Sequence, residues 1–367
     1  MTFRKSTLIY EKWLSRQLKI VPADLKHKHE LMKTAAFPFL RATFYRWSQI
    51  WPEVCEECAD APEVLAVGDL HVENFGTWRD VEGRLVWGIN DFDEACRMPY
   101  TIDLVRLACS AHLAIAADRL RIDHAEACAS ILKGYREGLE AGGMPFVLAG
   151  RHQWLREMVL PGMRDAAAFW EKLNTLPELE GNLPGAARRA IDKLMPGKIS
   201  GKYRISHRIA GLGSLGRQRF VAVAEYEGGF VCREAKALAS SAWELEQRSK
   251  PGAIRYQKAL DIGVRAVDPF VRLQGGWIVR RLAPDCTRVD LALFPKEREE
   301  SKLLHAMGWE TANLHLGTGR TQEVLADLEK RPAKWLHKAA TNMTLATKAD
   351  WEEWRGGPRK QVKAKKV

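Results

Sequence analysis

The sequence predicts an α+β fold with two lobes, in which helices come first and strands follow. Apolar residues recur at helical spacing within 8–20, 28–50, 101–118, 123–141 and most of 151–195. From about residue 200 the pattern becomes the alternation typical of strands, within 204–210, 218–226 and 230–235. Helical spacing returns at 298–317 and 321–346. We therefore expect a helical lobe over 1–200, a β-rich lobe over 201–285, helices that return to the first lobe over 286–350, and a basic disordered tail over 351–367.

Composition limits the class of protein. Hydrophobic residues make up 46% of the 367, enough for a sizeable core. Lys and Arg exceed Asp and Glu by 57 − 46 = 11 charges, which favours an anionic partner such as a nucleotide, a phosphorylated substrate, nucleic acid or a membrane surface. No apolar run approaches the roughly 20 residues of a membrane span, and the first residues lack the apolar core of a signal peptide. We expect a cytoplasmic protein.

Seven cysteines, an odd number at irregular spacing, argue against a disulfide framework. Cys55 and Cys58 form a single C-x-x-C without a second pair of ligands. Because a structural zinc site needs four ligands, the sequence pattern predicts no zinc site there.

Two acidic loops stand close together in the first lobe. A short apolar strand at 64–67 leads into Gly68-Asp69-Leu70-His71-Val72-Glu73-Asn74, and a hairpin then leads into Ile89-Asn90-Asp91-Phe92-Asp93. Phosphoryl transfer needs one carboxylate that orients the attacking hydroxyl, an amide oxygen on a metal ion, and a second carboxylate on Mg²⁺. The spacing Asp-x-x-x-x-Asn followed by Asp-Phe is the one kinases use. It predicts Asp69, Asn74 and Asp91 as catalytic residues. Asn74 and Asp91 would bind metal, and Asp93 would either assist them or cap the turn.

A glycine-rich loop lies in the β-rich lobe. Gly211, Gly213, Ser214 and Gly216 belong to a G-x-G-x-x-G segment between two predicted strands. A kinase phosphate loop has this context, whereas a dinucleotide fingerprint opens a helix. A tight hairpin with no ligand is the alternative interpretation.

The first acidic loop resembles that of aminoglycoside phosphotransferases and choline kinases. Together with Asn90-Asp91-Phe92-Asp93-Glu94-Ala95 and Asp103-Leu104-Val105-Arg106-Leu107-Ala108, it looks like the bacterial family called domain of unknown function 2252. The resemblance implies a protein-kinase-like fold that uses ATP and Mg²⁺ or Mn²⁺. It also implies that Asp103 braces the catalytic loop from behind.

One position departs from the family pattern. Where the family leads us to expect Lys-Glu-Ala, this chain has Arg233-Glu234-Ala235. We therefore expect Arg233 to be the cationic clamp on the phosphates. Lys236 is a possible substitute, although three residues further along a strand its side chain should lie on the opposite face.

The order of the motifs is reversed relative to kinases, in which the glycine loop precedes the catalytic aspartate. Either one motif is accidental or the chain is circularly permuted, and we adopt the permutation because a cleft is a spatial assembly. It predicts that the glycine loop faces Asn74 and Asp91 across a cleft, with Arg233 in the same space and Asp103 outside it.

The leading functional hypothesis is a phosphotransferase that uses Mg²⁺ and ATP on an unidentified hydroxyl, that of a small molecule or, as a second choice, a protein. The same cleft with ATP reversed would transfer an adenylyl group. Arg233 in place of lysine favours a non-catalytic nucleotide-binding regulator instead. Net charge alone suggests nucleic-acid binding, and no aromatic and basic platform supports it.

Overall fold

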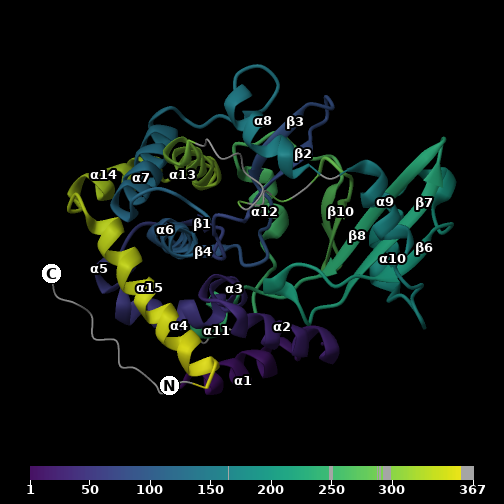
Figure 1. Ribbon diagram of the computed structural model, residues 1–367, viewed down its shortest axis with the longest axis horizontal. Coiled ribbons are helices and arrows are strands. Elements are labelled where there is room, and N and C mark those ends of the chain that lie inside the picture. The colour runs from purple at the N-terminus through teal and green to yellow at the C-terminus, as the bar shows by residue number, and fades with distance from the viewer. Residues whose placement is uncertain (164, 248–250, 287, 289–290, 292–298, 357–367) are drawn as a thin grey trace.

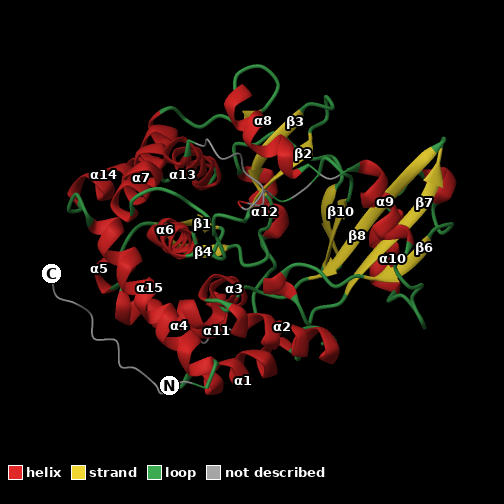
Figure 2. Ribbon diagram, in the orientation of Figure 1, coloured by secondary structure: helices red, strands yellow, loops and turns green. Residues whose placement is uncertain are grey.

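The computed structural model describes residues 1–163, 165–247, 251–286, 288, 291 and 299–356. Most helices gather in one half of the molecule and the long strands lie in the other, as Figure 1 and Figure 2 show. The α+β class is therefore confirmed. Within the described residues, no helix combines the length and the apolar character needed to cross a bilayer.

The helical lobe is built from both ends of the chain. Its helices are α1 (Phe3–Leu14), α2 (Pro22–Thr34), α3 (Ala36–Ala42), α4 (Phe44–Val54), α5 (Glu56–Ala59), α6 (Thr101–Ala116), α7 (His124–Glu140), α8 (Gln153–Val159), α13 (Glu300–Leu316), α14 (Thr321–Lys330) and α15 (Trp335–Trp354). Two small antiparallel sheets are set among them. They pair β1 (Glu63–Ala66) with β4 (Cys96–Pro99), and β3 (Leu85–Ile89) with both β2 (Phe75–Arg79) and β5 (Phe146–Val147).

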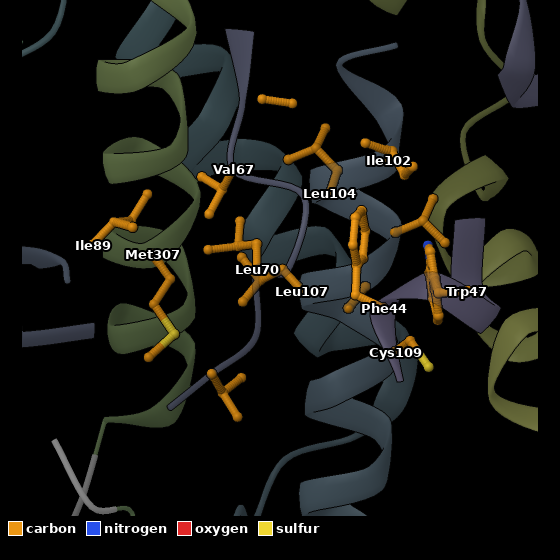
Figure 3. Close-up of a cluster of buried hydrophobic side chains, with 14 of the residues drawn as sticks. Phe44, Trp47, Val67, Leu70, Ile89, Ile102, Leu104, Leu107, Cys109 and Met307 are labelled. Carbon is orange, nitrogen blue, oxygen red and sulfur yellow. The ribbon is translucent and has the colours of Figure 1, made fainter. Parts of the chain in front are cut away.

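Helix α6 is the centre of this lobe, because every residue from Thr101 to Ala114 is buried. In Figure 3 its side chains Ile102, Leu104 and Leu107 lie among Leu70 of the first acidic loop and Phe44 of α4. The backbone of the acidic loop is therefore fixed by apolar packing on its inner side, which leaves its polar side chains to the outer side.

Helices α7 and α13 cross at glycines. A Cβ built on Gly308 would lie 2.0 Å from the carbonyl oxygen of Ile131, and one on Gly134 would lie 1.9 Å from that of His305. Any side chain at these positions would force the backbones apart. The two glycines therefore set the distance between α7 and α13.

The β-rich lobe holds a five-stranded antiparallel sheet in the order β6-β7-β8-β10-β9. Its strands are β6 (Arg204–His207), β7 (Arg219–Tyr226), β8 (Gly229–Ala237), β9 (Val271–Gln274) and β10 (Trp277–Arg281). The helices that belong to this half of the sequence are α9 (Ala166–Asn174), α10 (Gly185–Asp192), α11 (Ala242–Glu246) and α12 (Tyr256–Ile262). Three short 3-10 turns are η1 (Leu160–Gly162), η2 (Gly197–Ile199) and η3 (Leu212–Ser214).

Helices α9 and α10 pack on this sheet, and not on the helical lobe to which the sequence analysis assigned them. Ala187 and Ile191 of α10 join the core on one face of the sheet, while Phe169 and Leu173 of α9 pack against its other face. In Figure 1 both helices lie beside the long strands of this sheet, away from the helices of the other lobe. The β-rich lobe therefore begins near residue 165, earlier than the expected boundary at 200, because the amphipathic helices cover the sheet.

Two further boundaries differ from expectation. The predicted helix over 28–50 is divided at Ala35 and Thr43, and Pro38 lies in the first turn of α3, where its missing N–H has no helical partner to lose. Residues 351–354, expected in the tail, form the last turn of α15. Residues 355–356 form a turn after it, and 357–367 lie outside the described residues.

The first and last described helices are in contact. The backbone N–H of Phe3 donates to Glu353 Oε1 at 3.0 Å, and the rings of Phe3 and Trp354 meet edge to face with centroids 5.4 Å apart. Helices α1 and α15 thus close the helical lobe on itself.

Candidate functional site

A cavity of about 400 Å³ lies between the two lobes. The helical lobe contributes Asp69, Asn74, Asp91 and Asp93 to its lining, and the β-rich lobe contributes residues 211–214. Two motifs far apart in the sequence are therefore brought to one space, as the permuted arrangement predicted.

Asp103 braces the first acidic loop from behind. Its carboxylate accepts hydrogen bonds from the backbone N–H groups of Val67 at 2.7 Å and Gly68 at 2.8 Å, and it lies 3.0 Å from His315 Nε2. Asp103 is fully buried and does not line the cavity. The position expected for it is confirmed. Gly68 has a positive φ of 80°, a conformation that favours glycine at this turn.

Asp69 is paired with Arg106, a residue to which the sequence analysis gave no role. Arg106 Nε donates to Asp69 Oδ1 at 3.0 Å, and a second nitrogen of the guanidinium donates to the same oxygen. The guanidinium also donates to the carbonyl of Leu40 at 2.8 Å and lies 4.9 Å from the ring of Trp47. Because Arg106 is completely buried, it holds Asp69 in one orientation. An arginine inside the apolar pattern of 102–113 was the available signal.

Asn74 ties the two acidic loops together. Its amide nitrogen donates to the backbone carbonyl of Asp69 at 3.2 Å and to that of Asp91 at 3.0 Å. These two bonds fix which end of the amide is nitrogen. The amide oxygen is therefore turned away from both carbonyls and is the end suited to a metal ion.

Asp91 and Asp93 share a lysine from the opposite lobe. Lys236 Nζ lies 3.0 Å from Asp91 Oδ2 and 2.5 Å from Asp93 Oδ1, and Arg217 lies 3.3 Å from Asp93 Oδ2. Burial opposes ionisation of Asp91, but the charge of Lys236 outweighs it and lowers the pKa of Asp91. Burial and the charge of Asp91 raise the pKa of Asp93 to about 6. The pair thus shares its negative charge unequally.

Arg233, the expected phosphate clamp, points away from this cavity. Its Nε donates to the carbonyl of Leu194 at 2.8 Å, and its guanidinium lies 4.3 Å from the ring centroid of Phe270. Residues 233 and 236 occupy opposite faces of β8 because side chains alternate along a strand. The expectation that Arg233 is the phosphate clamp was therefore wrong. Lys236 lies on the opposite face of the strand, as predicted, and that face is the one that lines the site beside Asp91.

The glycine loop lies directly over Asp69. A Cβ on Gly213 would stand 3.0 Å from the carbonyl oxygen of Arg41 and 3.4 Å from Asp69 Oδ2. Lys28, a buried lysine of α2, donates to the carbonyl of Gly213 at 2.8 Å. The contact with the Arg41 carbonyl is the tighter one, so glycine at position 213 lets the loop pack closely against α3.

The other predicted loop residues divide between two roles. Gly211 and Ser214 line the cavity, and Ser214 Oγ accepts a hydrogen bond from Arg219 at 2.6 Å. Gly216 does not line it. Its carbonyl accepts from the N–H of Val21 at 2.8 Å, so Gly216 anchors the loop to the helical lobe and was misplaced among the phosphate-covering residues.

Two buried glutamates beside the cavity each gather several arginines. Glu234 is paired with Arg208, with Arg219 at 2.8 Å and with Arg280 at 2.9 Å. All three of these arginines line the cavity. Burial alone would raise the pKa of Glu234, but the three guanidiniums have the larger effect and bring it well below its ordinary value. Because three arginines surround one carboxylate, this side of the cavity carries a net positive charge.

Glu73 has a similar environment on the other side of the site. It pairs with Arg41 at 2.6 Å, Arg119 at 3.0 Å and Arg288 at 3.4 Å. The sequence pattern did not reveal either cluster, because the arginines come from separate elements.

Residues 18–152 match the model of a family described as an uncharacterized protein conserved in bacteria (DUF2252). No curated protein and no solved structure matches the chain. The matched residues include Asp69, Asn74 and Asp91 together with the bracing Asp103, and they end before the five-stranded sheet. The resemblance seen in the two acidic loops is therefore supported for this bacterial family.

Proposed function

We propose that this chain is a phosphotransferase that uses Mg²⁺ and ATP, with a circularly permuted kinase-like fold. The observation that carries the proposal is the ion pair between Lys236 and Asp91. In kinases the glycine loop precedes a lysine on the third strand, and that lysine works beside a metal-binding aspartate. Here the glycine loop joins β6 to β7, and Lys236 lies on β8, the third strand of the same sheet.

The residues present suit both ligands. Asn74, Asp91 and Asp93 would hold Mg²⁺, since they offer the oxygen donors that this ion prefers. The phosphates of ATP would lie under the glycine loop, where Lys236 and the arginines around Glu234 supply positive charge. Bound Mg²⁺ would neutralise the charge that develops on the transferred group.

Asp69 would orient the acceptor hydroxyl. Arg106 fixes the orientation of its carboxylate, so its role is to accept a hydrogen bond from the hydroxyl and align it. The acceptor is a small molecule or a protein whose hydroxyl can reach Asp69.

The main argument for a non-catalytic regulator was the arginine at position 233. That argument loses its force because Arg233 is on the other face of the sheet and Lys236 provides the amine.

The proposal is tested first by nucleotide binding. ATP with Mg²⁺ should raise the melting temperature of the protein, and at 100 times the Kd the stabilisation should be about 2.7 kcal/mol. Asp91→Ala should abolish the metal-dependent part. Asp60→Ala, outside the cavity, is the matched control and should keep it. A wild-type melting curve that does not change at saturating Mg²⁺ and ATP would contradict the proposal.

A second experiment separates catalysis from binding. Asp69→Asn retains an oxygen for Arg106 but loses the charge that aligns the hydroxyl. We expect turnover to fall at least 100-fold, as when a positioned catalytic carboxylate is lost, with nucleotide affinity changed by no more than a few-fold. Candidate acceptors are found by mass spectrometry of the phosphorylated products. A collapse of nucleotide affinity in Asp69→Asn would show that its role is different.

A further inference from the structure

A cluster of potential metal ligands lies away from the cavity, where α6, α7 and α15 meet. His112 of α6, Cys128 of α7 and His337 of α15 each place one ligand atom within 4.8 Å of the other two. His112 and Cys128 are buried, and His337 is half-buried. None of the three lines the cavity between the lobes. The proposed phosphotransferase chemistry does not use them.

The hydrogen bonds in the cluster do not account for all of its polar atoms. Nδ1 of His337 is buried and has no hydrogen-bond partner. An unpartnered buried nitrogen is costly, and a metal ion is one of the few ligands that would satisfy it. Nε2 of His112 lies 3.4 Å from both Cys128 Sγ and the carbonyl of His124.

The spacing of the cluster suits zinc. With Zn–N bonds of about 2.0–2.1 Å and a Zn–S bond of about 2.3 Å, a tetrahedral site separates nitrogen and sulfur ligands by roughly 3.5 Å. The 3.4 Å between His112 Nε2 and Cys128 Sγ matches that separation. Thiolate and imidazole together favour Zn²⁺ over Mg²⁺ or Ca²⁺.

A fourth side chain is within reach. His124 is one helical turn before Cys128 on α7, and its ring centroid lies 4.6 Å from that of His112. Residues four apart on a helix share a face. Rotation of the His124 side chain would complete a four-coordinate site.

We propose that His112, Cys128 and His337 bind a structural Zn²⁺ ion, with His124 as the fourth ligand. The thiol of Cys128 releases its proton to solvent when the ion binds, because zinc takes the thiolate. The ion would link α15 to α6, the helix that carries Asp103 and Arg106.

The test uses the full-length protein purified from cells supplied with Zn²⁺. Elemental analysis should find close to one Zn²⁺ per chain, and removal of the ion with a chelator should lower the melting temperature until Zn²⁺ is restored. Co²⁺ loaded in place of Zn²⁺ should give a thiolate-to-cobalt charge-transfer band in the near ultraviolet.

Matched variants assign the ligands. Cys128→Ser should lose the charge-transfer band, whereas Cys232→Ser, which changes a buried cysteine of the β-rich lobe, should keep it. His337→Ala should weaken Co²⁺ binding at least tenfold relative to His27→Ala, an exposed control. Wild-type protein that holds no stoichiometric metal and shows no band with excess Co²⁺ would overturn the proposal, even if Cys128→Ser failed to fold. Retention of the band in Cys128→Ser would also overturn it.

Discussion

The two cations on β8 can be separated by one pair of substitutions. Lys236 is beside Asp91 and Asp93, whereas Arg233 lies against Phe270 on the opposite face. Lys236→Met should therefore remove most of the stabilisation by Mg²⁺ and ATP, and Arg233→Met should leave it unchanged. Thermal shift measured across an ATP titration checks both variants. Equal losses in the two variants would show that the face of the strand does not decide the role.

Glu310 gives the protein a measurable pH dependence. Its buried carboxylate accepts from the N–H of Ile89 at 3.2 Å and from Asn313 Nδ2 at 2.7 Å. Burial, only partly offset by Arg265, raises the pKa of Glu310 from 4.5 to about 7. Between these values the folded protein holds a proton that the unfolded chain has released. The stabilisation of the folded protein by this bound proton is therefore complete below pH 4.5 and is lost as the pH rises through 7.

Glu310→Gln should remove this dependence, because the amide is neutral at every pH. The free energy of unfolding of the wild type relative to Glu310→Gln should fall by about 3 kcal/mol between pH 4.5 and 8. Denaturant titrations at several pH values measure the difference. The ionisation of all other groups is common to both proteins and cancels in the comparison. A difference that stays constant with pH would mean that Glu310 ionises normally.

At this scale the sequence predicted which loop residues line one cavity, but not which basic residues join them. Two short, neighbouring segments carry Asp69, Asn74 and Asp91. Their spacing along the chain was therefore enough to predict that they lie close together. The partners Arg106 and Lys236 come from other elements, and only the folded chain brings them to the carboxylates. Arg233 was predicted to be the phosphate clamp from its place in a motif. Because side chains alternate along a strand, it lies on the face away from the cavity.

At the scale of elements, the crossing of α7 and α13 depends on two glycines. Gly308→Ala would place a Cβ 2.0 Å from the Ile131 carbonyl, so the helices must separate. We expect the free energy of unfolding to fall by about 2–3 kcal/mol, as in other overpacked cores. Gly197→Ala is the control, because nothing lies within 4 Å of its added Cβ. Equal stabilities of the two variants in urea would contradict this account of the crossing.

Strands and long helices were largely predictable, because apolar periodicity is a local property. The lobe to which a helix belongs was not. Helices α9 and α10 have amphipathic faces that would suit either lobe. Which partner they cover depends on the sheet that forms after them in the chain.

At the scale of the whole molecule, ion pairs connect the lobes across the cavity. Lys236 and Arg217 come from the β-rich half, and their partners Asp91, Asp93 and Glu94 come from the helical half. Two of these partners, Asp91 and Asp93, are among the proposed metal ligands. Binding of a metal ion and ATP would therefore replace some of these ion pairs between the lobes with contacts to the ligand.

The contact between Phe3 and Glu353 has a consequence for the order of the genetic message. A short peptide linker could join the ends of α1 and α15, and the chain could be reopened in the connection between α8 and α9. The rearranged polypeptide would present the glycine loop first, then Lys236, and only afterwards Asp69 and Asp91. That is the order in which these motifs occur in ordinary kinases. Under the proposed kinase-like fold, the order of the motifs would be set by the point at which this connected path of elements is opened.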